Sequence, residues 1–214
     1  MRAWSRMFNS FLTGIPGQAP YTDDDYFAHV DGKPRYDGVR DFLASRGIEI
    51  PEGTPEDAPT EETVCGLGNR KNEEFNLTLA RDGVEPFPGS AALVRDLAAR
   101  GVAMAVVSSS KNARPVLAAA GLTDFFPVVV DGVVALQEGL PGKPAPDTYL
   151  RAADLVGATP AECVVVEDAI SGVQSGAAGD FGLVVGVDRG VGAEELRANG
   201  AAVVVNDLEE LRQS

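Results

Sequence analysis

The chain carries two different hydrophobic patterns. In its first part, apolar residues such as Trp4, Phe8 and Phe11 recur at three- and four-residue spacing, which indicates amphipathic helices. A stretch rich in Pro, Glu and Thr, residues 50–63, interrupts this pattern and predicts an exposed loop. Residues 1–82 are therefore expected to form a helical domain.

The second part, residues 83–214, alternates short apolar runs with helical stretches. The expected strands are 102–107, 128–130, 163–166, 183–187 and 202–205. The expected helices are 90–99, 113–120, 147–156 and 170–178. Most of the runs are apolar without alternation, as in parallel strands covered on both faces. This order predicts an α/β fold with a Rossmann-like, doubly wound parallel sheet.

Composition and charge narrow the function. The 214 residues are 44% hydrophobic and 23% charged, which is typical of a soluble globular protein. The net charge of −14, from 18 basic and 32 acidic residues, disfavours nucleic acid, whose phosphates need a basic surface. No apolar run approaches the roughly 20 residues of a membrane helix, and no signal-peptide cleavage site follows the start. We expect a cytoplasmic monomer that does not bind membranes.

Candidate chemistry follows the predicted strands, because ligands of such sheets bind at the carboxyl ends of the strands. Ser108, Ser109, Ser110, Lys111 and Asn112 come after one strand and open a helix. Hydroxyl groups and free backbone N–H groups at a helix N-terminus can bind a phosphate. Simple helix capping is the alternative.

Lys143 is the second candidate. Two nearby prolines, Pro144 and Pro146, restrict the backbone beside it, so its ammonium could be held in one place and bind a phosphate oxygen. The alternative is an ordinary solvated lysine. From the sequence alone, replacing Lys143 by Met in an extended protein is expected to abolish turnover and to leave folding nearly intact.

Glu167 and Asp168 form the third candidate, at the end of an apolar run and directly before a helix. Two carboxylates at a strand end can hold Mg²⁺, which prefers oxygen ligands shared with a substrate phosphate and water. Asp168 could instead be only a helix N-cap. Gly172 and Gly176, four residues apart, suggest that the helix packs closely on its neighbours.

Together these segments resemble a known family. Residues 107–112, 143–147 and 166–172 are similar to the second, third and fourth motifs of the haloacid dehalogenase superfamily, and within it to the β-phosphoglucomutases. The resemblance implies an α/β core with a helical cap domain, Ser108 and Lys143 as catalytic residues, and Mg²⁺ held by Glu167 and Asp168. It also implies phosphoryl transfer through an aspartyl-phosphate.

The same resemblance extends to the helical part. It implies that Trp4, Arg35 and Lys71 of the cap contact the substrate, opposite the 109–112 segment on the core side. Without it, Trp4 would be interpreted as a core residue and Arg35 as a solvated charge.

The expected reaction converts glucose 1-phosphate into glucose 6-phosphate. A sugar-phosphate phosphatase and an inert phosphate-binding fragment are the alternatives. A nicotinamide-binding Rossmann domain is disfavoured, because the Gly-x-Gly pairs at 66–68 and 190–192 lack the third glycine and the preceding strand.

One motif of the superfamily has no counterpart here. Its Asp-x-Asp pair, which carries the nucleophile, normally lies on a central strand before the cap, and the aspartates at 23–25 and Asp131 are poor substitutes. We therefore expect the nucleophile to lie upstream of this chain and the chain alone to be inactive. We also expect the strands before Ser108 and Glu167 to have unpaired edges.

Overall fold

The computed structural model describes residues 2–212. The chain divides after Gly83 into two compact units, and each is described by itself. Within the described residues, no helix combines the length and apolar character that a membrane span needs.

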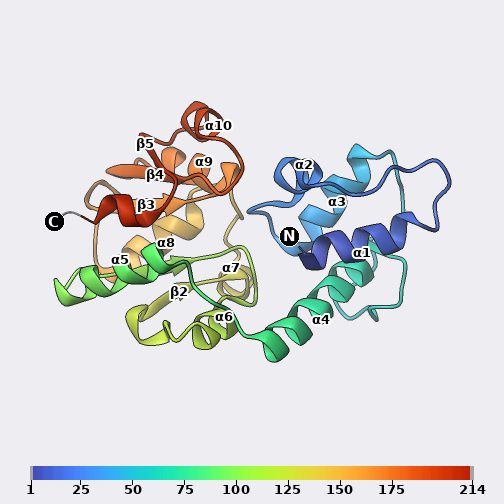
Figure 1. Ribbon diagram of the computed structural model, residues 1–214, viewed down its shortest axis with the longest axis horizontal. Coiled ribbons are helices and arrows are strands. Elements are labelled where there is room, and N and C mark those ends of the chain that lie inside the picture. The colour runs from blue at the N-terminus through green and yellow to red at the C-terminus, as the bar shows by residue number, and fades with distance from the viewer. Residues whose placement is uncertain (1, 213–214) are drawn as a thin grey trace. The chain divides into compact units, whose positions relative to one another are not determined.

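The first unit is helical (Figure 1). Its elements are α1 (Arg2–Leu12), α2 (Asp23–Asp25), the π-helical turn η1 (Tyr26–Val30), α3 (Arg35–Ser45) and α4 (Val64–Asp82). Helix α4 packs against α1 and α3 around fully buried Phe8, Phe42 and Leu67, and the rings of Phe8 and Phe42 lie 4.2 Å apart. The helical pattern and the 50–63 loop are confirmed.

The polar character of residues 23–25 predicts a loop, but these aspartates form α2. The reason is local: the side chain of Thr22 accepts a hydrogen bond from the backbone N–H of Asp25, and the Asp25 carboxylate accepts one from the backbone of Thr22 in return. This capping box satisfies N–H groups at the start of a helix. Asp25 also forms an ion pair with Arg46 at 2.6 Å, so its carboxylate is structural.

The second unit is α/β, as predicted. Its strands are β1 (Ala105–Val107), β2 (Val128–Val130), β3 (Val164–Glu167), β4 (Leu183–Val187) and β5 (Val203–Val205). Its helices are α5 (Pro88–Ala99), α6 (Ala113–Ala119), α7 (Gly132–Glu138), α8 (Asp147–Val156), α9 (Ile170–Ala178) and α10 (Ala193–Ala198). Short 3₁₀ turns are η2 (Thr123–Phe125), η3 (Pro160–Glu162) and η4 (Leu208–Leu211).

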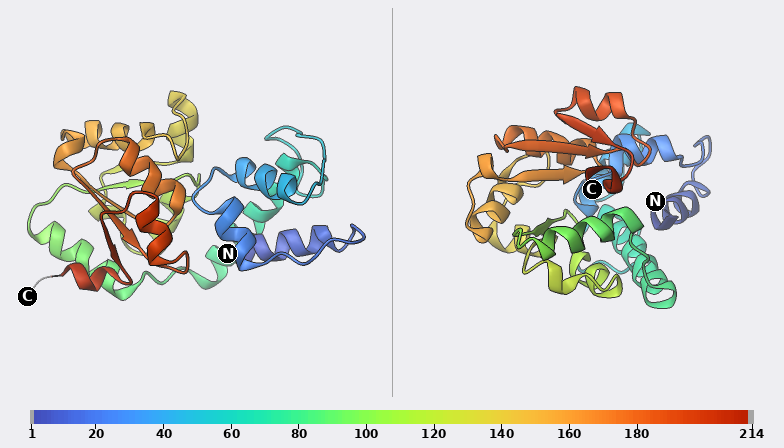
Figure 2. Two further views of the ribbon diagram at one scale, coloured as in Figure 1. Left: turned by 90° about the horizontal axis from the view of Figure 1, so that it is seen from above. Right: turned by 60° about the vertical axis from the view of Figure 1, so that its left-hand side comes forward.

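All strand pairs are parallel, but they form two sheets. β1 pairs with β2, and β4 lies between β3 and β5, so one edge of β1 and one edge of β3 have no strand partner among residues 2–212. Figure 2 shows β3, β4 and β5 side by side, in orange to red. On β3, Val164 and Val166 remain 57% and 41% exposed. The expected unpaired edges are thus present.

Helices cover these strands. Helix α8 packs on β1 and β2, and α9 packs on β3 and β4. Gly176 of α9 allows this approach, because a Cβ there would lie 3.1 Å from side-chain atoms of both Val165 and Val184. The close packing that the glycine spacing suggested is confirmed.

Two details differ from the sequence prediction. The first strand begins at Ala105, because Val102 belongs to the turn after α5, where its N–H donates to the carbonyl of Leu97 at 3.0 Å. Helix α7 was not expected. Buried Asp131 caps it by accepting hydrogen bonds from the N–H groups of Val133 and Val134 at 2.9 and 3.1 Å. Asp131 is therefore structural.

Candidate functional site

A buried ion pair is the centre of the candidate site in the second unit. The Nζ of Lys143, in the loop between α7 and α8, contacts Oε1 of Glu167 at the end of β3. The two side chains are 4% and 10% exposed. The interpretation of Lys143 as a solvated lysine is therefore wrong, because its four-carbon stem and its ammonium are both covered.

Several contacts hold this pair in place. Ser175, fully buried on α9, donates to the carbonyl of Ala145 at 2.7 Å and fixes the loop that carries Lys143. Tyr149, on the first turns of α8, accepts a hydrogen bond from the Lys143 ammonium at 3.2 Å and donates one to Oε1 of Glu167 at 3.1 Å. Lysine has three N–H donors. Lys143 uses two of them for Tyr149 and Glu167, so one N–H remains for a ligand.

Glu167 uses both carboxylate oxygens. Its Oε2 accepts from the backbone N–H groups of Asp168 and Ala169 at 2.8 and 2.9 Å. Burial alone would raise the pKa of Glu167, but the nearby Lys143 charge and the hydrogen bonds from Lys143 and the two backbone N–H groups hold that pKa below its ordinary value. Glu167 is therefore ionised at neutral pH.

Gly172 makes room for this carboxylate. A Cβ at position 172 would overlap the Cδ and Oε1 atoms of Glu167. A side chain on the first turn of α9 would thus push Glu167 away from Lys143. This glycine is needed for close approach and not for an unusual backbone angle.

The two acidic residues differ in their fit to Mg²⁺. Glu167 already accepts four hydrogen bonds, whereas the Asp168 side chain lies at the exposed strand end. The N-cap of α9 is Ala169, so the alternative that Asp168 is only an N-cap is wrong. Within residues 2–212, no three His, Cys, Asp or Glu side chains cluster as a metal cage. Mg²⁺ usually keeps several waters and binds substrate phosphate, so one or two protein carboxylates are enough to hold it. Asp168 fits this role.

The Ser108 segment lies at the end of β1. Ser108 continues the strand pairing through its N–H to the carbonyl of Val130 at 3.0 Å, and its Oγ accepts from the N–H of Ser110 at 3.2 Å. The Ser110 hydroxyl accepts from the N–H of Asn112 at 3.1 Å, and α6 begins at Ala113. The Ser108 oxygen is thus oriented, while its proton can still be donated to a phosphate oxygen.

The same loop packs tightly on the start of α7. A Cβ at Gly132 would lie 2.7 Å from the carbonyl oxygen of Ser109 and 3.2 Å from atoms of Lys111. The structure therefore joins Lys143 and Glu167 by direct contact. It places the Ser108 segment at the end of β1, in the other sheet.

A second cluster of predicted site residues lies in the first unit. The ammonium of Lys71, on α4, lies 4.9 Å from the ring centroid of Trp4 and 4.9 Å from that of Phe75. Such cation–π contacts stabilise a partly desolvated ammonium. Trp4 is buried in the helical core, where it stacks on Phe8 at 5.5 Å.

Arg35 belongs to the same cluster. Its Nη1 donates to Oδ1 of Asn69 at 3.2 Å, and Asn69 also binds the backbone of the 50–63 loop. Burial, and secondarily the charge of Arg35, lower the pKa of Lys71 to about 8. The unit therefore presents two neighbouring cations, one of which loses its charge in mildly alkaline solution.

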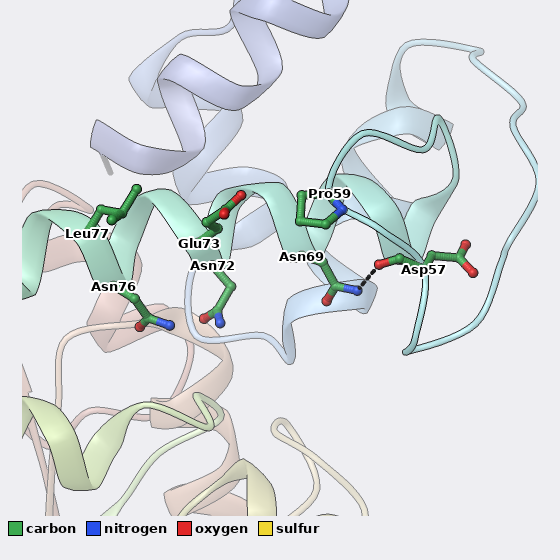
Figure 3. A pocket seen from close by; sticks show the side chains of 7 residues that line it. All are labelled: Asp57, Pro59, Asn69, Asn72, Glu73, Asn76 and Leu77. Carbon is green, nitrogen blue, oxygen red and sulfur yellow. Dashed lines mark hydrogen bonds between the residues drawn. The ribbon is translucent and has the colours of Figure 1, made fainter.

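A pocket of about 510 Å³ lies beside α4 (Figure 3). Its lining consists of Asp57, Pro59, Asn69, Asn72, Glu73, Asn76 and Leu77. Amide side chains dominate it, and the predicted site residues are not among its lining. Asn69 of this lining accepts a hydrogen bond from Arg35.

Sequence reasoning missed Tyr149, Asn69 and Phe75. Two of them could have been suspected from their positions, since Phe75 lies four residues after Lys71 on a helix and Tyr149 lies at the start of the helix that follows Lys143. However, tyrosine and phenylalanine in a helix usually pack in a core, so spacing alone does not identify them.

Comparisons with known proteins support the family resemblance. Residues 5–180 match the haloacid dehalogenase-like hydrolase family. A β-phosphoglucomutase of Mycobacterium bovis is 49% identical over 98% of this chain and 84% of its own length. Hexitol phosphatase A of Escherichia coli is 31% identical over 98% of this chain and 84% of its own length. The crystal structure of a β-phosphoglucomutase from Clostridium difficile, only 20% identical, has a TM-score of 0.79 over 99% of this chain and 86% of its own, which shows the same fold.

Proposed function

Because the chain belongs to the haloacid dehalogenase-like hydrolase family, we propose that it acts in phosphoryl transfer on a hexose phosphate, converting β-glucose 1-phosphate into glucose 6-phosphate. The observation that carries the proposal is the 49% identity to a β-phosphoglucomutase over nearly the whole chain. The buried Lys143 supplies the chemical support, since pairing with Glu167 need not repay the cost of burying an ammonium, which favours a functional reason for its place.

In this proposal Lys143 and Ser108 bind the phosphoryl group that is transferred. Charge develops on the phosphoryl oxygens during transfer, and a fixed ammonium and a hydroxyl stabilise it without reorganisation. Glu167 holds Lys143 in place. A bound Mg²⁺, with Asp168 as its carboxylate ligand, would neutralise further phosphate charge.

Arg35 and Lys71 are proposed to bind a second phosphate of the substrate. Their positive charges lie together in the first unit, with Asn69 orienting the guanidinium. A mutase needs such a second anion site, because its substrate bears two phosphates midway through the reaction. A phosphatase that releases its product as inorganic phosphate does not need one.

A sugar-phosphate phosphatase is the second candidate, favoured by the 31% identity to hexitol phosphatase A. The two candidates differ in the acceptor: a sugar hydroxyl in the mutase, and water in the phosphatase. Product analysis separates them.

The test is an assay of β-glucose 1-phosphate conversion with Mg²⁺ and a sugar bisphosphate primer. The assay uses this chain and, in parallel, the protein as expressed in its native host. Glucose 6-phosphate formation that Lys143→Met abolishes supports the proposal. Phosphate release without isomer identifies a phosphatase, and folded protein without either activity identifies a binding-only fragment.

A further inference from the structure

Tyr149 is a buried tyrosine whose hydroxyl faces two charged groups. Its side chain is 8% exposed and belongs to the core formed with Val165, Val173 and Val184. Its ring meets that of Phe181 edge-on, with centroids 5.9 Å apart. Apolar packing therefore holds the ring, and a phenylalanine ring could make the same contacts.

The hydroxyl nevertheless makes two directed hydrogen bonds. It accepts from Nζ of Lys143 at 3.2 Å and donates to Oε1 of Glu167 at 3.1 Å. Only a group that is donor and acceptor at once can close this triangle, and a phenol is such a group.

Without the hydroxyl, the ammonium would keep Glu167 as a hydrogen-bond partner and the face of the ring, whose centroid lies 4.8 Å from Nζ. Lysine is a flexible point charge on a four-carbon stem, and one ion pair leaves it free to rotate about the carboxylate. Two contacts from different elements, α8 and the end of β3, fix the direction of the third N–H bond. That third donor is the one available to a phosphate oxygen.

We propose that Tyr149 is a positioning residue, whose hydroxyl orients Lys143 toward the phosphate. This inference rests on the proposed function, which assigns Lys143 to phosphate binding. It predicts that removing one oxygen atom, without changing the ring, weakens phosphate binding and slows transfer.

The test compares Tyr149→Phe with Tyr149→Leu and with a matched control, Tyr21→Phe. The Tyr21 hydroxyl is also buried but has no hydrogen-bond partner within residues 2–212, so its removal should change nothing. We expect Tyr149→Phe to weaken inorganic phosphate binding, measured calorimetrically, by about five-fold, the size of one lost hydrogen bond. It should lower kcat more than it raises KM.

Tyr149→Leu should lose the same affinity and additionally melt at lower temperature, because it also removes the ring. If Tyr149→Phe binds phosphate like the unaltered chain and only Tyr149→Leu is impaired, Tyr149 is a core residue and the proposal is overturned.

A ligand-free measurement separates this proposal from the proposed function. The chain has four lysines, Lys33, Lys71, Lys111 and Lys143, so the ¹⁵Nζ signal of Lys143 can be assigned by its loss in Lys143→Met. We expect slow ammonium proton exchange in the unaltered chain and faster exchange in Tyr149→Phe. Equal exchange rates would refute the positioning role. Absence of phosphate binding by the unaltered chain would instead count against the proposed function, and the exchange rates would still decide the role of Tyr149.

Discussion

Replacing Lys143 by Met is expected to destabilise the protein as well as stop turnover. Met keeps most of the volume of the stem but removes the charge that compensates Glu167, whose side chain is 10% exposed. Breaking a buried ion pair typically costs about 3–5 kcal/mol, because one charge remains buried without its partner. Glu167 keeps three donors, from Tyr149, Asp168 and Ala169, so we expect the lower end, about 3 kcal/mol at pH 7.

The pH dependence of this loss provides a second check. In the unaltered chain the pKa of Glu167 is lowered, so its contribution is present above the unfolded-state pKa and is lost as pH falls through the folded-state value. Without Lys143, burial dominates and raises that pKa, so stability is instead lost as pH rises. The difference between the two proteins should therefore shrink on going from pH 7 to pH 5.

Urea unfolding followed by circular dichroism at both pH values measures these losses. Trp4 is the only tryptophan of the sequence, so its fluorescence follows the first unit separately and serves as an internal control. The double variant Lys143→Met/Glu167→Gln should regain part of the loss, since no charge is then left unpaired. If Lys143→Met is as stable as the unaltered chain at pH 7, or if its loss grows toward pH 5, the account of the pair is wrong.

Three further results are expected. Lys71→Met should weaken sugar-phosphate binding at pH 7, as measured by titration calorimetry. The unaltered chain is expected to lose affinity as the pH rises through about 8, and the variant should lack this pH dependence. An unchanged pH profile would contradict the role of the Lys71 charge. Gly172→Ala should destabilise the second unit by about 1–3 kcal/mol, the usual cost of overpacking, and should reduce turnover because it displaces Glu167. An unaltered melting temperature and activity would show that Glu167 can move without cost. Thr148→Val should be neutral or stabilising in thermal melts, because the buried Thr148 hydroxyl has no hydrogen-bond partner within the described residues; a large loss would reveal a hidden partner.

Much of the fold could be predicted from the sequence, because parallel strands buried on both faces are continuous apolar runs. The runs at 128–130 and 183–187 coincide with β2 and β4 to the residue. Helix α7 was missed because its seven residues, directly after a strand, are too few to show a helical period. The formation of α7 depends on the Asp131 cap, and the spacing of apolar residues gives no sign of a polar cap.

The candidate site was predictable only in part. Glu167 could be named from its place at a strand end, and Lys143 from the prolines beside it. Their mutual contact and deep burial could not, because they depend on how α8 and α9 pack on different strands. For that reason the sequence suggested that Glu167 would bind a metal, whereas the structure shows both of its oxygens engaged by protein donors.

The most direct test of the central claim is a ³¹P NMR time course of β-glucose 1-phosphate with Mg²⁺ and a bisphosphate primer, using the protein as expressed in its native host. The account predicts that the 1-phosphate signal is replaced by that of glucose 6-phosphate, with inorganic phosphate a minor product. Accumulation of inorganic phosphate without glucose 6-phosphate would contradict it.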